Sequence, residues 1–204
     1  MILVKICGVT TVEDAVLAAE LGASAIGLVF WPGSPRFVEV GQAKEIVAAL
    51  PPLVSAIGVF VNQAEHAAHV AREVGLNGVQ FHGDEAPGSY AAFPARVIKA
   101  IAVRDDSAED AAAAVPPGVT VLLDAHDPVR RGGTGKSIDW SIAAKIARQR
   151  RVMLSGGLTA DNAAEAVAAV APYAIDVSSG VERVIGRKDP AKLRALFAAL
   201  RTGL

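Results

Sequence analysis

Two side chains with acid–base chemistry, Cys7 and Asp124, each end an apolar run of the sequence. A lone cysteine is more often a small buried hydrophobe than a base, and that alternative stays open for Cys7. A carboxylate at the end of an apolar run is costly unless it is paired or functional, which favours a catalytic Asp124. The alternative for Asp124 is an acceptor that fixes the following loop through Gly135. The sequence therefore indicates a possible acid–base pair.

Glycine and serine clusters follow the last two apolar runs of the chain. Gly156 and Gly157 lie in the first cluster, and Ser179 and Gly180 lie in the second. Glycine lets backbone N–H groups approach an anion closely, and helix N-termini add a favourable dipole. These glycines would otherwise serve only tight turns. Because both clusters contain them, the sequence favours phosphate binding.

Short apolar runs alternate with Ala-rich segments of helical period, which is the pattern of repeated β-α units. The predicted strands span 2–7, 25–30, 54–60, 78–81, 96–102, 119–124, 152–154 and 174–178. The predicted helices span 11–22, 40–50, 63–75, 86–93, 106–115, 139–150, 160–171 and 190–202. No G-x-G-x-x-G follows the first strand, which disfavours an open doubly wound sheet. The pattern predicts an α/β chain with one domain, 1–204, folded as a (β/α)₈ TIM barrel.

Polar residues predict where several of the helices begin. Thr11 starts a segment that resembles a capping box, and Asn62, Thr159 and Asp189 stand where an N-cap is expected. Each of these side chains has an oxygen that can accept a hydrogen bond from a free N–H of the first helical turn.

A barrel of this kind brings the carboxyl ends of its strands to one mouth, where the chemistry of such enzymes sits. Cys7 and Asp124 would face each other across that mouth. His82 follows the fourth predicted strand, either as a ligand contact or as a rim histidine held by a backbone bond. The loops after strands seven and eight are those with which barrels often bind phosphate.

Composition narrows the class of protein. The chain has 204 residues and a formal net charge of −1, so nothing global favours nucleic acid or an anionic membrane. No apolar stretch approaches the ~20 residues of a membrane span. A single cysteine excludes an intrachain disulfide and favours the cytoplasm. No spacing of His and Cys is typical of a metal site.

Together these residues resemble a known family, the phosphoribosylanthranilate isomerases of tryptophan biosynthesis. The resemblance runs in order from residue 3 to about 197. The motifs that carry it are Lys5-Ile6-Cys7-Gly8, Ser34-Pro35-Arg36, Phe60-Val61-Asn62, Gln80-Phe81-His82-Gly83, Gly133-Thr134-Gly135-Lys136, Ser155-Gly156-Gly157-Leu158 and Asp176-Val177-Ser178-Ser179-Gly180-Val181-Glu182. One departure is Phe81, where the family pattern leads us to expect an aliphatic residue.

The resemblance implies a reaction, the Amadori rearrangement of N-(5′-phosphoribosyl)anthranilate to 1-(2-carboxyphenylamino)-1-deoxyribulose 5-phosphate. It implies that Asp124 protonates the furanose oxygen and that Cys7, as a thiolate, removes the C2′ proton. Both pKa values must then move toward the working pH, and Lys5 is a candidate for favouring the thiolate.

The resemblance also implies how the substrate is held. Arg36 would bind the anthranilate carboxylate, and Asp176 would contact a ribose hydroxyl. The remaining expected substrate contacts are His82, Gly133, Gly156, Gly157, Ser179 and Gly180. The family implies a small phosphorylated substrate, no metal or organic cofactor, and a monomer or a homodimer.

Three competing functions remain. The isomerase of similar chemistry in histidine biosynthesis, and isomerases that act on both substrates, are expected to have aspartate where Cys7 stands. A barrel that only senses a sugar phosphate would be favoured if Cys7 or Asp124 were replaced, and both are present.

Overall fold

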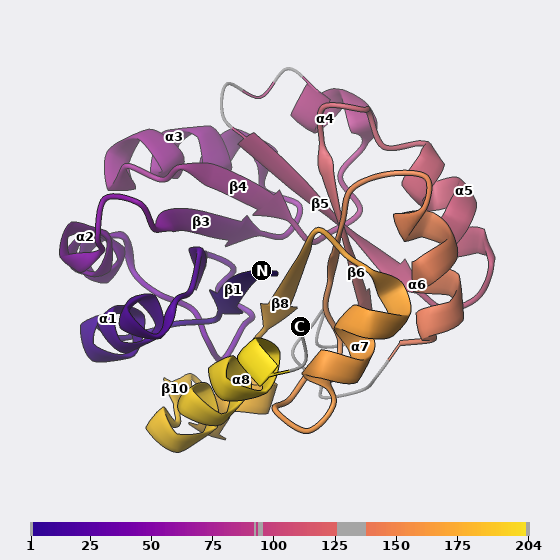
Figure 1. The fold of residues 1–204 in the computed structure, drawn as a ribbon. Coiled ribbons are helices and arrows are strands. Elements are labelled where there is room, and N and C mark those ends of the chain that lie inside the picture. The colour runs from indigo at the N-terminus through magenta and orange to yellow at the C-terminus, as the bar shows by residue number, and fades with distance from the viewer. Residues whose placement is uncertain (1, 92, 94–95, 126–137, 203–204) are drawn as a thin grey trace.

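The structure, a computed structural model, describes residues 2–91, 93, 96–125 and 138–202 (Figure 1). Eight parallel strands pair in chain order and close into a barrel, because β1 also pairs with β8. The strands of the barrel are β1 Leu3–Cys7, β2 Ala25–Val29, β3 Ser55–Phe60, β4 Gly78–Phe81, β5 Arg96–Val103, β6 Thr120–Ala125, β7 Val152–Leu154 and β8 Ala174–Val177. The (β/α)₈ TIM barrel predicted from the sequence is confirmed.

Helices alternate with the strands and surround the barrel (Figure 1). They are α1 Val12–Leu21, α2 Val40–Ala49, α3 Ala64–Val74, α4 Pro87–Ala91, α5 Ser107–Ala113, α6 Trp140–Ala147, α7 Ala163–Val170 and α8 Pro190–Thr202. The largest differences from prediction are the end of α6 at Ala147 and the start of α7 at Ala163, where we expected 150 and 160. No helix among the described residues is long and apolar enough to cross a membrane.

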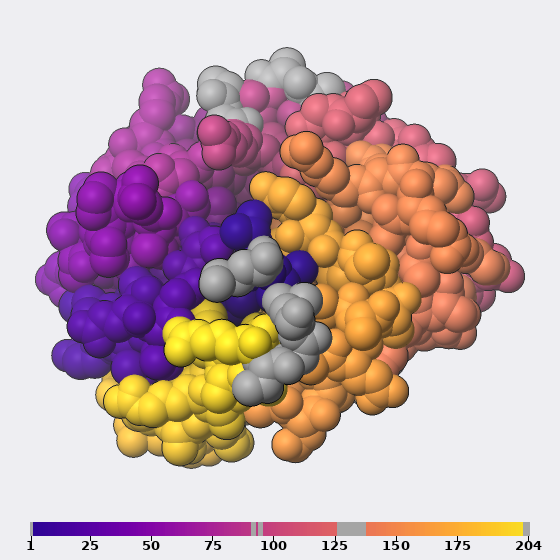
Figure 2. Space-filling view, in the orientation of Figure 1, coloured from indigo at the N-terminus to yellow at the C-terminus, as the bar shows by residue number. Residues whose placement is uncertain are grey.

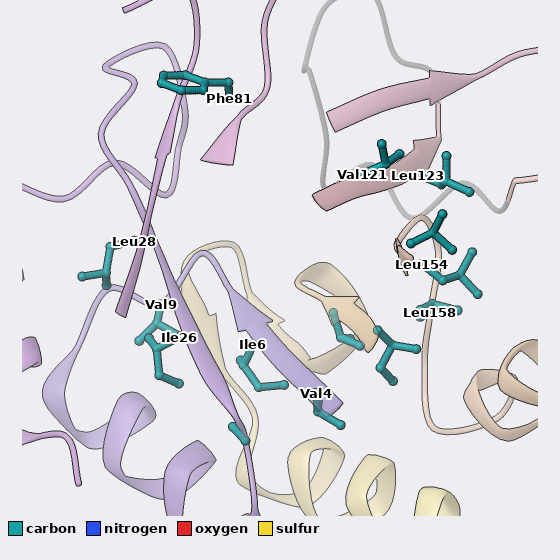
Figure 3. Close-up of a cluster of buried hydrophobic side chains, with 14 of the residues drawn as sticks. Val4, Ile6, Val9, Ile26, Leu28, Phe81, Val121, Leu123, Leu154 and Leu158 are labelled. Atoms are coloured by element: carbon teal, nitrogen blue, oxygen red, sulfur yellow. The ribbon is translucent and has the colours of Figure 1, made fainter. Parts of the chain in front are cut away.

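Alternate residues of each strand pack between the barrel and the helices, as the two-residue period of a strand requires. Figure 3 shows part of this layer, including Val4 and Ile6 of β1 and Ile26 and Leu28 of β2. All four are at most 3% exposed, and the same layer continues around the barrel. Figure 2 shows the N-terminal segment directly beside the C-terminal third of the chain, as closure between β1 and β8 requires.

The remaining strand residues point into the barrel, and their character changes along its axis. Leu122, Met153 and Ala174 form one apolar cluster inside the barrel. A second cluster at the opposite level contains Cys7 and its neighbours Val29 and Val59. Apolar side chains thus close one end of the barrel, as in TIM barrels generally, and leave polar groups to the C-terminal end.

Two of the four predicted N-caps are confirmed. The Thr11 hydroxyl accepts a hydrogen bond from the Asp14 N–H at 3.3 Å, and Asp189 accepts from the Ala191 N–H at 2.8 Å. These oxygens satisfy N–H groups that the first turn of a helix leaves free.

The other two N-caps, Asn62 and Thr159, are wrong. Helix α3 follows Gln63, since Asn62 takes a positive φ of 55° and its side chain accepts from the N–H of Asp84. Asn62 therefore links the loops after β3 and β4. Helix α7 begins later than Thr159 because a turn intervenes, and its N-cap is Asn162.

A short insertion between β8 and α8 was not predicted from the sequence. It consists of a 3₁₀ turn, η1 Ser179–Val181, and an antiparallel hairpin of β9 Glu182–Val184 and β10 Arg187–Lys188. Strands of two and three residues have too few positions for an alternating pattern to be recognised. The hairpin matters for the site because it supplies two buried charged side chains to it.

Candidate active site

A cavity of about 710 Å³ lies at the carboxyl ends of the barrel strands. It brings together nearly all the side chains singled out in the sequence. The predicted site residues that line it are Cys7, Arg36, His82, Asp124, Gly156, Gly157, Asp176, Ser179 and Gly180. Gly133, the remaining one, lies outside the described residues.

Cys7 lies at the end of β1 above a buried ion pair. Lys5 precedes it by two residues and therefore points to the same face of the strand. The Lys5 ammonium is 1% exposed and lies 2.7 Å from the carboxylate of Asp176 on the neighbouring β8. A Cβ atom at Gly27 on β2 would lie 2.8 Å from the Cys7 sulfur and 3.0 Å from the Lys5 nitrogen. Only glycine there leaves room for both side chains.

The charges around Cys7 act in opposite directions on its thiol. Burial raises the pKa of Cys7, and the negative charge of Asp176 adds to that increase. Lys5 and Lys188 lower it but do not outweigh burial and Asp176. Lys5 therefore favours the thiolate, as we expected. The net shift of the Cys7 pKa is nevertheless upward, whereas the reaction requires a lower pKa. The pKa of Lys5 is raised to about 12, because Asp176 and Cys7 together outweigh the lowering effect of burial.

Asp124 is 5% exposed near the end of β6. Its Oδ1 accepts a hydrogen bond from the backbone N–H of Ala125 at 2.9 Å. Its Oδ2 lies 3.3 Å from Nε2 of His82, whose Nδ1 lies 2.9 Å from the amide nitrogen of Gln80. Within the part of the chain that the structure describes, the ring of His82 is held by these two side chains, and the backbone bond that we considered is not seen. Gly135, through which Asp124 would fix the loop, lies outside the described residues.

Arg36 extends from the loop after β2 and is held by the unpredicted hairpin. Its Nε and one terminal nitrogen donate to the two oxygens of Glu182, at 2.8 and 2.7 Å. The buried Lys188 ammonium lies 3.0 Å from the same carboxylate and also donates to the carbonyl oxygens of Cys7 and Ser178. Burial by itself would raise the pKa of Glu182, but Arg36 and Lys188 lower it below its usual range. This bidentate contact uses two of the three guanidinium nitrogens of Arg36.

The glycine clusters after β7 and β8 line the cavity and depend on glycine for their conformation or packing. Gly156 and Gly157 take positive φ values of 89° and 66°, a conformation that other residues rarely adopt. A Cβ atom at Gly180 would lie 1.9 Å from the carbonyl oxygen of Leu158, so the two loops pack directly against each other. Gly156, Gly157 and Gly180 all line the cavity, so at these positions the backbone faces it with no side chain of its own in between.

Three charged or polar residues of the site were not recognised as such in the sequence. Gln80 and Glu182 appeared only within longer motifs, and Lys188 was not singled out. The two-residue period does place Gln80 on the same face as His82, so that signal was available. For Lys188 there was none, because its contacts to Cys7 and Glu182 depend on the hairpin. The described residues contain no cluster of three or more His, Cys, Asp or Glu that could hold a metal ion.

Comparison with known proteins identifies the family. A family model described as N-(5′-phosphoribosyl)anthranilate (PRA) isomerase matches residues 4–199. The chain belongs to this family. Membership confirms that the chain is an enzyme, a phosphoribosylanthranilate isomerase of tryptophan biosynthesis, as the ordered motifs predicted.

Individual phosphoribosylanthranilate isomerases match along their whole length. The curated enzyme of Trichlorobacter lovleyi is 49% identical over 206 residues, which cover 100% of both chains. A crystal structure of monomers derived from the dimeric enzyme of Thermotoga maritima has a TM-score of 0.89 and 35% identity, and the match covers 99% of this chain and 100% of that one. A phosphoribosylanthranilate isomerase solved in complex with reduced 1-(o-carboxyphenylamino)-1-deoxyribulose 5-phosphate has a TM-score of 0.88 and 37% identity, with the same coverage.

Proposed function

We propose that Cys7 and Asp124 catalyse the rearrangement of N-(5′-phosphoribosyl)anthranilate as general base and general acid. The observation that carries the proposal is their convergence on one cavity, which also contains a cation for a carboxylate and two glycine loops for a phosphate. The substrate has a carboxylate at one end and a phosphate at the other. A cavity that contains a cation, two glycine loops, an acid and a base matches these groups of the substrate.

The reaction proceeds in steps that these two residues supply. Asp124 donates a proton to the furanose oxygen as the C1′–O bond breaks, and the nitrogen lone pair forms the Schiff base. Cys7 as thiolate removes the C2′ proton, and the electrons of the C–H bond move toward the iminium nitrogen to give an enolamine. Return of a proton to C1′ and loss of the proton from the 2′-hydroxyl then give the ketone, so that no atom is gained or lost.

The reaction requires a thiolate, whereas burial and Asp176 raise the pKa of Cys7. We infer that a ribose hydroxyl donates a hydrogen bond to Asp176 when the substrate binds. Such a bond reduces the negative potential of Asp176 at Cys7 and leaves Lys5 as the charge that dominates there. Substrate binding would then promote ionisation of Cys7 just before this residue has to accept the C2′ proton.

Substrate binding follows from the same arrangement. Arg36, held by Glu182, presents its second terminal nitrogen to the anthranilate carboxylate. The loops at Gly156–Gly157 and Ser179–Gly180 bind the phosphate through backbone N–H groups. His82 and Gly133 complete the proposed substrate contacts. The crystallised relative that holds a reduced carboxyphenylamino-deoxyribulose phosphate supports the assignment of the cavity to this ligand class.

The experiment that tests the proposal uses the fluorescence of the substrate. The purified protein is expected to consume phosphoribosylanthranilate without added metal or cofactor. Replacement of either residue, as Cys7→Ala or Asp124→Asn, is expected to lower kcat by about 10²–10⁴-fold, the usual contribution of one general acid or base. Full activity of either variant would refute its role.

The same assay with the corresponding substrate of histidine biosynthesis separates the nearest alternative. Turnover there would show a broader specificity than Cys7 predicts. Three properties stay predictions from the sequence: the lack of a cofactor, the cytoplasmic location, and an assembly that is either a monomer or a homodimer.

A further inference from the structure

Three side chains in contact, Gln80, His82 and Asp124, form a row along one wall of the cavity. Gln80 on β4 is 1% exposed, and its amide nitrogen lies 2.9 Å from Nδ1 of His82. Nε2 of the same ring lies 3.3 Å from Oδ2 of Asp124 on β6. The strand between them, β5, points Ile98 into the barrel beside Gln80, but at the level of His82 and Asp124 its inward side chains are the small ones of Ala100 and Ala102. The imidazole can therefore span from β4 to β6.

The atoms on either side of the His82 ring determine which ring nitrogen carries the proton. An amide nitrogen is only a donor, so Nδ1 of His82 must accept the hydrogen bond from Gln80. A neutral imidazole has one donor and one acceptor nitrogen, and the proton is then on Nε2. That N–H faces the carboxyl group of Asp124.

The carbonyl oxygen of the same amide is the second unusual feature. Oε1 of Gln80 is buried and has no hydrogen-bond partner within the described part of the chain. A buried acceptor without a partner costs about 1–3 kcal/mol, and such atoms in native proteins call for an explanation. Gln80 lines the cavity but its Oε1 has almost no accessible surface, so a donor on the substrate reaches this oxygen only when binding shifts the amide. The substrate has such donors beside its reacting carbons, the amine N–H and the ribose hydroxyls.

We propose that Gln80 is a positioning residue which fixes His82 in its Nε2–H tautomer, directs that N–H to Asp124, and accepts a hydrogen bond from the substrate through Oε1. This inference rests on the proposed role of Asp124 as the acid. When Asp124 gives its proton to the ring oxygen, a negative charge forms on its carboxylate. A neutral N–H donor already in place stabilises that charge as it develops, with no reorganisation of the site.

The first test reads the tautomer directly in the wild-type protein. Long-range ¹H–¹⁵N correlation spectra distinguish a protonated from an unprotonated ring nitrogen, and the chain has only four histidines. The His82→Asn variant assigns the signals of His82 by their loss. We expect Nε2 to be protonated and Nδ1 unprotonated near neutral pH. A proton on Nδ1 would overturn the inference, whatever the activity of the enzyme.

The second test separates the two atoms of the amide by kinetics. Gln80→Glu keeps an acceptor for the substrate but removes the donor to His82, whereas Gln80→Met removes both. We expect kcat to fall about 5–100-fold in both variants, as loss of one buried hydrogen bond predicts. The KM is expected to rise in Gln80→Met and to stay within about twofold of wild type in Gln80→Glu. Unchanged kcat in Gln80→Glu with the wild-type fold would refute the proposal.

A matched control is available at Gln63. Its Oε1 is also buried without a partner in the described structure, but Gln63 does not line the cavity. Gln63→Met is therefore expected to leave kcat and KM unchanged. If Asp124→Asn keeps full activity while the His82 tautomer is as expected, the acid assignment fails and the positioning of His82 stands. If Asp124→Asn is inactive and the tautomer is reversed, only the inference about Gln80 fails.

Discussion

Replacement of Glu182 by glutamine tests how much its buried ion pairs stabilise the fold. Its carboxylate accepts hydrogen bonds from two nitrogens of Arg36, at 2.8 and 2.7 Å, from Lys188 at 3.0 Å and from the Gly186 N–H at 3.3 Å. Arg36 and Lys188 are 8% and 1% exposed. In Glu182→Gln, two buried cations lose their shared counterion, and the new amide NH₂ group faces donors instead of an acceptor.

The size of the effect follows from that burial. Removing one partner of a buried ion pair costs about 3–5 kcal/mol, because an uncompensated charge stays behind. For a chain of this length each kcal/mol lowers Tm by about 2–4 °C, so the expected decrease is about 6–20 °C. The KM is expected to rise as well, since Arg36 loses the contact that orients it toward the cavity.

The assay is equilibrium unfolding in urea, with a surface ion pair as control. Lys44 and Glu73 lie 2.8 Å apart, but their side chains are 47% and 39% exposed. Glu73→Gln is expected to leave the free energy of unfolding close to that of the wild type, because solvent screens an exposed ion pair. A Glu182→Gln variant as stable as Glu73→Gln would refute the account of the buried network.

Acid should remove the difference between wild type and Glu182→Gln. The folded-state pKa of Glu182 lies below its usual value, so its stabilising contribution is fully present above about pH 4.3, the unfolded pKa. The contribution is lost as the pH falls from there through the lowered pKa. The two unfolding free energies should therefore converge as the pH is lowered from 7 to 3, and a difference that grows would contradict the sign of the shift.

Two further predictions concern the loops and the thiol. Gly180→Ala is expected to abolish tight substrate binding, because its Cβ would lie 1.9 Å from the Leu158 carbonyl oxygen, while Gly118→Ala, where nothing lies within 4 Å, should bind as wild type. Alkylation of Cys7 by iodoacetamide, followed by mass spectrometry, should keep accelerating beyond about pH 8.5, the usual cysteine pKa. Asp176→Asn should shift that rise to lower pH, and a plateau near pH 7 in the wild type would contradict the raised pKa.

The barrel could be predicted because its signals are local. Each strand is covered on both faces, so it appears in the sequence as a continuous apolar run, and proline or glycine marks the ends of several helices. Alternation along one strand also places Lys5 beside Cys7 and Gln80 beside His82. The rule that strand ends share one mouth then brings Cys7 and Asp124 to one site.

The electrostatics of the site could not be predicted in the same way. Arg36 and Glu182 are 146 residues apart in sequence, and they meet because a hairpin with very short strands places Glu182 in the wall of the cavity. The direction of the Cys7 pKa shift is set by a balance: burial and Asp176 raise the pKa, and two lysines lower it. Such a balance depends on distances and burial across the barrel, which sequence spacing does not contain.

The central claim, that Asp124 opens the ring and Cys7 then removes the C2′ proton, is tested most directly by a kinetic isotope effect. The measurement compares kcat/KM for the substrate with hydrogen and with deuterium at C2′, in the wild type, in Cys7→Ser and in Asp124→Asn. Because a poorer base makes C–H cleavage limiting, the isotope effect should increase in Cys7→Ser. Because a missing acid makes ring opening limiting, it should fall toward unity in Asp124→Asn. The opposite pattern, or the same change in both variants, would contradict the assignment of the two roles.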